Sequence, residues 1–182
     1  MLIDRDGSNL AVRSSNGDLL ALSARKSRFA VSRWLQGEGL VPDHDQTDAR
    51  ARFYKCDSLG CITVDPLRPV VAFVTDPRVF SEDCQRAEFI VASVPLPRSL
   101  KRSCRRYATV IDLYDLRQEG AHAVWFEPDG ARVVSASDHR GSRPWSSFHE
   151  SLKLLGRLHQ DDTEASRTRC AQMAQTSSAA AR

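Results

Sequence analysis

The chain has 182 residues, of which 41% are hydrophobic and 27% are charged. This length is typical of one domain, with or without a tail, and the composition is ordinary for a protein that buries a core. The net charge of +3 is too small to indicate nucleic-acid binding by itself. The sequence has neither an apolar run of about 18 residues nor a signal peptide. We therefore expect the chain by itself to stay in the cytoplasm.

The N-terminal third is predicted to form strands and one helix. Residues 1–24 read as strands joined by a turn at Asn16-Gly17, the strongest short hairpin signal. Residues 26–39 predict a helix that is capped by Ser27. Its predicted apolar face consists of Phe29, Ala30 and Trp34. The polar residues 40–52 predict a loop.

The middle of the chain predicts three strands, at about residues 52–56, 61–65 and 69–75. A helix is expected to follow them, with Asp76 as its N-cap. Pro77 then occupies the first helical position, where its missing N–H has no cost.

Alternating strands and helices are predicted from residue 88 onward. The apolar residues 88–94 and 108–113 predict strands buried on both faces. A basic helix or loop is expected between them, and a short helix after them should end at Gly120. Residues 121–137 predict a hairpin in which Trp125 belongs to the core. The sequence therefore predicts an α/β fold, with mixed sheets flanked by helices.

The residues from about 150 onward lack aromatic anchors and predict a frayed helix or a disordered tail. The expected domains are accordingly residues 1–149 and a tail of residues 150–182.

Few residues indicate catalysis or metal binding. No two of the five histidines are spaced as a ligand pair, and no second close Cys/His pair would complete a zinc site with Cys56 and Cys61. A nucleophile elbow and a phosphate-binding glycine loop are both absent. Asp112 and Asp115 follow a predicted strand, where a helix cap is the more ordinary role for an acid than catalysis. We therefore predict no catalytic residue, no metal site, no cofactor and no small-molecule substrate.

One segment concentrates positive charge. The stretch "PRSLKRSCRRY" contains no acidic residue, and its cations are Arg98, Lys101, Arg102, Arg105 and Arg106. These side chains are candidates to contact a phosphate backbone, although a solvated helix face would have the same composition.

Several segments together resemble the C-terminal soluble region of a ComEC-type competence protein, a membrane channel that carries transforming single-stranded DNA. The resemblance covers about residues 1–149. It is carried by "LIDRDGSNLAVRSSNGDLLALSARKSRFAVSRWLQGEG", "CDSLGC", "VAFVTDPRVFSEDCQRAEFIVASVPLPRSLKRSC", "ATVIDLYDLRQEGAHAVW" and "DHRGSRPW".

The resemblance implies a reduced metallo-β-lactamase-like sandwich. In that family the soluble region is thought to be a nuclease that degrades the strand that is not transported. Asp76 would then stand where the metal-bridging aspartate is expected, but residues 94–96 read Val-Pro-Leu where a metal-binding histidine is expected. No His-x-His-x-Asp-His motif is present anywhere. One carboxylate cannot hold a dinuclear centre, so we expect a scaffold without nuclease activity.

The resemblance also suggests an oxidising location, the outer face of the inner membrane, where disulfides persist. Two disulfides are then candidates, Cys56–Cys61 across a four-residue hairpin tip and Cys84–Cys104. Chain-entropy estimates give about 2 and about 3 kcal/mol for the two loops. The alternative is four buried thiols, because a free cysteine packs as a small hydrophobe. Cys170 would remain as an unpaired thiol in the tail.

The sequence leaves three hypotheses for function. The first is a non-catalytic domain of a DNA-uptake channel, whose partners are the transmembrane channel portion and either single-stranded DNA or partner uptake proteins. The second is a metal-dependent nuclease with rearranged ligands, such as Asp76, Asp112, His122 and His139. The third is a truncated remnant without an activity of its own.

Overall fold

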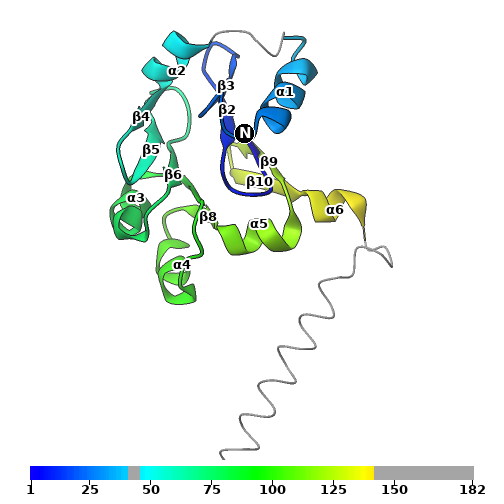
Figure 1. Ribbon diagram of the computed structural model, residues 1–182. Coiled ribbons are helices and arrows are strands. Elements are labelled where there is room, and N and C mark those ends of the chain that lie inside the picture. Colours follow the sequence, from blue (N-terminus) through cyan, green and yellow to red (C-terminus); the bar gives the residue numbers. More distant parts are fainter. Residues whose placement is uncertain (41–45, 142–182) are drawn as a thin grey trace, which may run out of the picture. The chain divides into compact units, whose positions relative to one another are not determined.

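The computed structural model describes residues 1–40 and 46–141, and these residues form two sheets with helices packed against them (Figure 1). The predicted α/β class, with mixed sheets and flanking helices, is confirmed. The predicted domain boundary at residue 149 and the predicted tail of residues 150–182 lie outside the described residues.

Sheet A contains five strands, all antiparallel, in the order β10-β9-β1-β2-β3. Their bounds are β1 Leu2–Ile3, β2 Leu10–Arg13, β3 Leu19–Ala21, β9 His122–Glu127 and β10 Gly130–Ser135. The predicted turn between β2 and β3 is confirmed. Gly17 adopts a φ of 92° there, a conformation that glycine accepts without strain.

Sheet B also contains five strands, in the order β4-β5-β6-β7-β8. Their bounds are β4 Tyr54–Cys56, β5 Gly60–Thr63, β6 Val71–Val74, β7 Phe89–Ala92 and β8 Thr109–Ile111. The first three strands are antiparallel, whereas β6, β7 and β8 run parallel. Every residue of β7 is buried, as its continuous apolar sequence predicts.

The described helices connect these strands. They are α1 Arg28–Gly37, α2 Thr47–Phe53, the 3-10 helix η1 Pro77–Val79, α3 Phe80–Arg86, α4 Arg98–Cys104, α5 Leu113–Glu119 and α6 Ala136–Arg140. Within this part of the chain, no helix has the length and apolarity that a membrane span requires.

The two sheets share one apolar core. Leu10 and Val12 of sheet A pack in the same cluster as Phe73 and Phe89 of sheet B. The hydroxyl of Tyr54 in sheet B donates a hydrogen bond of 2.8 Å to the carbonyl of Leu20 in sheet A. Helix α1 covers the other face of sheet A, and α3 and α4 cover the other face of sheet B (Figure 1). The layers therefore run helix, sheet, sheet, helix.

The predicted apolar face of the first helix is correct only in part, because Trp34 packs against the apolar cluster under α1 but Phe29 does not. Val31 and Leu35 are the buried residues of α1, whereas Phe29 is 81% exposed. Ser27 stands at the N-cap position as predicted, and its carbonyl accepts a hydrogen bond from the Val31 N–H, but it adopts a left-handed conformation with φ 49° and its side chain makes no capping hydrogen bond. Its hydroxyl donates instead to the Asp4 carboxylate, so it ties the start of the helix to the loop after β1.

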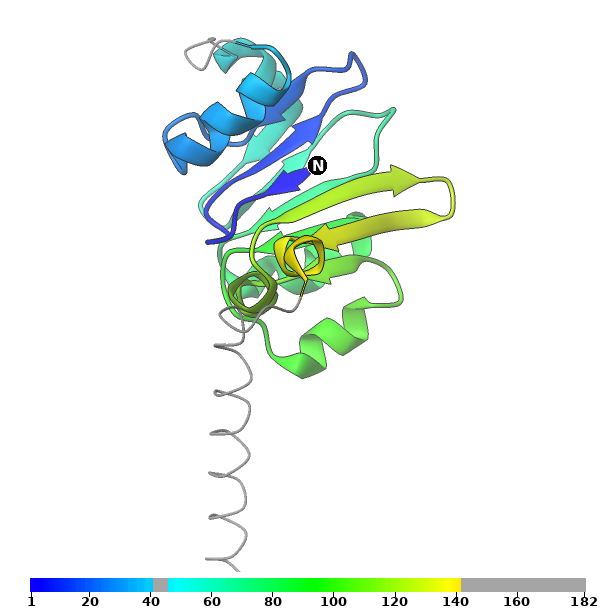
Figure 2. The ribbon, with the colours of Figure 1, turned by 90° about the vertical axis from the view of Figure 1, so that its right-hand side faces the viewer.

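Two further predictions differ from the structure. Residues 47–52 of the predicted loop, together with Phe53 from the start of the predicted strand, form helix α2, which is anchored by the buried Phe53. Trp125 is 45% exposed rather than part of the core, and the Arg132 guanidinium lies 4.2 Å from its ring centroid. Figure 2 shows α1 lying over β2 and β3, away from the hairpin of β9 and β10 that carries Trp125.

Candidate functional site

The basic segment forms helix α4, which packs on the outer face of sheet B. Leu100 and Cys104 point into the apolar cluster between α4 and that sheet. A disulfide joins Cys104 to Cys84 of α3, with 5.5 Å between the Cα atoms. The buried side of α4 is therefore fixed to its neighbour, and its basic residues project from a rigid support.

A pocket of about 400 Å³ opens beside this helix, a volume at the lower end of the range for small-ligand sites. It is lined by Pro95, Leu96, Arg98, Lys101, Arg102, Arg105, Asp112, Tyr114 and Asp115; we call it the basic pocket. Leu96 follows β7 and Asp112 follows β8, two parallel strands. Ligands of open α/β sheets commonly bind in this position, beyond the carboxyl ends of parallel strands.

Lys101 and two carboxylates form the floor of the basic pocket. The Lys101 ammonium lies 3.1 Å from Asp112 Oδ1 and 2.5 Å from Asp115 Oδ2, and only 14% of the Lys101 side chain is exposed. Asp112 and Asp115 also form a reciprocal capping box at the start of α5. The helix-cap prediction for Asp112 is therefore confirmed. The charge of Lys101 is balanced by these acids, so the lysine acts as a link between α4 and α5.

The Asp112 carboxyl is buried yet ionised. Burial alone would raise its pKa, but hydrogen bonds from the backbone N–H groups of Leu96 and Asp115 and from Lys101 outweigh that effect and lower the pKa. The backbone after β7 is thereby fixed to the carboxyl end of β8.

The arginines of the basic pocket have a different environment. Arg98, Arg102 and Arg105 are exposed, and none of their side chains has a hydrogen-bond or ion-pair partner within residues 1–40 and 46–141. Their spacing of four and then three residues places them on one face of the helix. Arg106 is also exposed but does not line the pocket. The structure thus brings four of the five predicted cations together, and three of these have side chains that no other described residue neutralises.

Tyr114 adds an aromatic surface to this site. It lines the basic pocket and is 54% exposed. An aromatic ring beside cations is the combination that binds single-stranded nucleic acids, because bases stack on the ring while phosphates meet the charges. Tyr114 is not among the site residues predicted from the sequence. Its only signal was its position between the two capping acids.

The candidate ligands of a rearranged metal site do not converge. Asp76 accepts hydrogen bonds from the side chain and backbone of Arg78, which hold its pKa at about 2, and it caps η1 as predicted.

His122 is buried, where Gly120 and Glu119 contact its two ring nitrogens. His139 belongs to α6, and Asp112 is paired with Lys101. The described residues contain no group of three or more His, Cys, Asp or Glu side chains placed to hold a metal ion.

Both predicted disulfides are confirmed. Cys56 and Cys61 face each other in the register of β4 and β5, with 4.0 Å between their Cα atoms. The next pair toward the tip, Asp57 and Gly60, is hydrogen-bonded. Because such pairs alternate along an antiparallel ladder, the cysteines form a non-hydrogen-bonded pair. Cys170 lies outside the described residues.

We compared the chain with protein-family models, with curated proteins and with solved structures, and no match was found in any of the three comparisons.

Proposed function

We propose that this chain is a non-catalytic, ComEC-like domain that contacts single-stranded DNA through the basic pocket. The observation that carries the proposal is the set of arginines that have no side-chain partner in the described part of the chain and that lie beside the exposed ring of Tyr114. Four cations against two carboxylates leave the pocket with excess positive charge, and the two carboxylates are already bound to Lys101.

The sequence resemblance supplies the biological setting of the proposal. It makes the transmembrane portion of a ComEC-type channel the partner and the periplasmic face of the inner membrane the location. The two disulfides fit an oxidising compartment. The succession of layers, helix–sheet–sheet–helix, is compatible with a reduced metallo-β-lactamase-like sandwich.

The test is the affinity for a labelled oligothymidylate, measured by fluorescence anisotropy over a range of salt concentrations. We expect the triple variant Arg98→Gln/Arg102→Gln/Arg105→Gln to bind at least about tenfold more weakly. Each phosphate contact contributes about −0.7 to the slope of log K against log salt for single strands. The loss of three contacts should therefore make this slope less steep by about 2.

A matched variant separates this site from general electrostatics. Arg25→Gln/Arg28→Gln/Arg33→Gln removes the same charge from three exposed arginines in and before α1. We expect this variant to bind with nearly unchanged affinity and slope. Equal losses in both variants, or unchanged binding by the pocket variant, would contradict the proposal.

The nuclease hypothesis predicts a different result. Elemental analysis of the purified chain would then find zinc or manganese in stoichiometric amount, and DNA would be cleaved. A remnant without activity would neither bind nor cleave DNA.

A further inference from the structure

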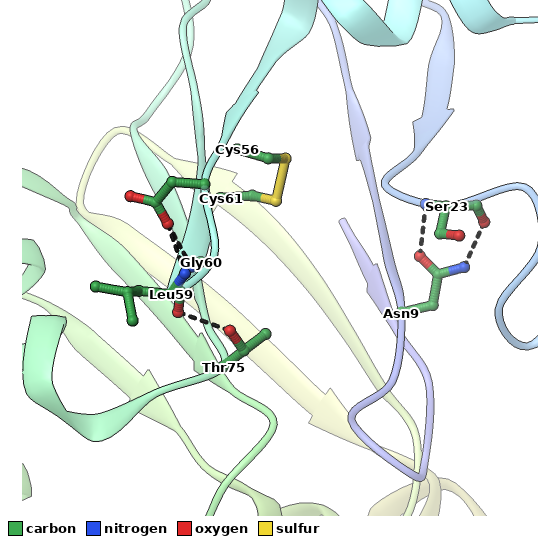
Figure 3. The surroundings of a disulfide bond; sticks show 8 residues. Asn9, Ser23, Cys56, Leu59, Gly60, Cys61 and Thr75 are labelled. Atoms are coloured by element: carbon green, nitrogen blue, oxygen red, sulfur yellow. Dashed lines mark hydrogen bonds between the residues drawn. A yellow bond between two sulfur atoms is a disulfide. The ribbon is translucent and has the colours of Figure 1, made fainter.

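The disulfide Cys56–Cys61 lines a second pocket, on the face of sheet B opposite to the face that α4 covers. This pocket has a volume of about 460 Å³, and its lining includes both cysteines, Lys26, Ser23 and Thr75. Figure 3 shows the two sulfur atoms on the side of the β4–β5 hairpin that faces Asn9 and Ser23. Cys56 is exposed and Cys61 is half-buried, so the bond can be reached from solvent.

Hydrogen bonds also hold the hairpin tip, independently of the disulfide. The Asp57 carboxylate accepts hydrogen bonds of 2.7 and 2.9 Å from the backbone N–H groups of Leu59 and Gly60. The Leu59 carbonyl in turn accepts hydrogen bonds from the hydroxyl and the N–H of Thr75, the residue that follows β6 (Figure 3). None of these contacts involves a sulfur atom, so we expect them to keep the two cysteines opposite each other after the bond between them is broken.

The second disulfide, Cys84–Cys104, is shielded from solvent. Cys84 is 8% exposed and Cys104 is fully buried, and both belong to the apolar cluster under α3 and α4. A thiol can reach this bond only after the two helices separate from sheet B. Such an opening requires a large part of the free energy of unfolding.

We propose that Cys56–Cys61 is a site of reversible thiol–disulfide exchange, and that its substrate is the reactive thiolate of a dithiol oxidoreductase or of a small dithiol. The thiolate attacks Sγ of Cys56, the bond between the two cysteines breaks, and Sγ of Cys61 leaves as a thiolate. The second thiol of the reductant then attacks the mixed disulfide. Both cysteines are left reduced, and the reductant is left as a disulfide.

The test uses the native full chain, with free thiols blocked by N-ethylmaleimide before reduction. Dithiothreitol is then added at graded concentrations, the newly formed thiols are labelled with iodoacetamide, and the peptides are identified by mass spectrometry. We expect Cys56 and Cys61 to be labelled at least about tenfold faster than Cys84 and Cys104, with unchanged circular dichroism. Transfer of an unlabelled, reduced sample into oxidised glutathione, which takes up the two electrons, should restore the bond.

Two controls separate accessibility from the intrinsic chemistry of the bonds. In denaturant both disulfides should be reduced at similar rates, because the fold no longer protects one of them. The variant Cys56→Ser/Cys61→Ser should remain folded and leave the slow reduction of Cys84–Cys104 unchanged. Equal rates in the native chain, earlier reduction of the buried bond, or unfolding upon reduction of Cys56–Cys61 would each overturn the proposal.

Discussion

Asp112 illustrates how one buried charge can organise a site. Its carboxylate accepts hydrogen bonds from the backbone of Leu96 and Asp115 and from the Lys101 ammonium. The carboxylate therefore fixes three segments at once: the chain after β7, helix α4 and the start of α5. Removal of such an acceptor leaves buried donors without partners, which is more costly than the loss of an exposed ion pair.

We expect Asp112→Asn to lower the free energy of unfolding by about 1–3 kcal/mol at neutral pH, because an amide cannot accept all of these bonds. The folded-state pKa of Asp112 is lowered, so its stabilisation is present above the pKa of the unfolded state and is lost as the pH falls through the folded-state pKa. The difference between wild type and variant should thus be constant above about pH 5 and shrink in acid.

Urea denaturation at several pH values measures this difference. The control is Asp129→Asn in the exposed turn between β9 and β10, for which we expect no change. A difference for Asp112→Asn that stays the same at every pH would contradict the role assigned to its charge.

At the scale of elements, the contact between β5 and β6 depends on the absence of a side chain. A Cβ atom at Gly60 would lie 2.5 Å from the carbonyl oxygen of Phe73. The neighbour is backbone within a ladder, so it cannot move without breaking the pairing of the two strands.

We expect Gly60→Ala to destabilise the chain by about 1–3 kcal/mol, as overpacking generally does. Gly37→Ala is the matched control, because a Cβ at the end of α1 would meet nothing within 4 Å. That variant should be unchanged or up to about 1 kcal/mol more stable. Chemical denaturation compares the two, and equal stabilities would refute the explanation.

Elements with strong local signals could be predicted from the sequence. The Asn16-Gly17 turn, the buried strand β7 and the Asp76 cap are specified by adjacent residues. The face of α1 was predictable only in part: Trp34 does pack against the cluster of Val31 and Leu35, but Ala30 and Trp34 have the same spacing as the two residues that are buried. Trp125 stands between Val124 and Phe126, so its apolar neighbours gave no alternation from which to choose its side of the sheet.

The candidate site was predictable only in part. The run of basic residues indicated α4, and the capping pattern indicated Asp112. Neither signal revealed that Lys101 pairs with acids of another helix, or that Tyr114 lies beside the arginines. These contacts depend on how α4 and α5 follow parallel strands, which is a property of the tertiary fold.

At the scale of the described fold, the core shared by the two sheets should make them unfold together. Phe89 of sheet B is fully buried and packs edge to face with Phe126 of sheet A, with 6.0 Å between the ring centroids. Loss of this ring removes contacts from both sheets.

We expect Phe89→Ala to lower the free energy of unfolding by about 3–5 kcal/mol. Far-ultraviolet circular dichroism and tryptophan fluorescence should still report one coincident transition. The same substitution at the exposed Phe29 should change stability by less than about 0.5 kcal/mol. Two separate transitions, or equal effects at the two positions, would show that the sheets do not share a cooperative core.

The position of β1 has a consequence for synthesis on the ribosome. This strand lies between β2 and β9, and Leu2 pairs with both Ala11 and Ala123. The N-terminal strands therefore emerge early, but one edge of β1 has no neighbouring strand until β9 has been translated. All strands of sheet B emerge in that interval. We thus expect the nascent chain to assemble sheet B first and to complete sheet A last, when its late hairpin joins the waiting first strand.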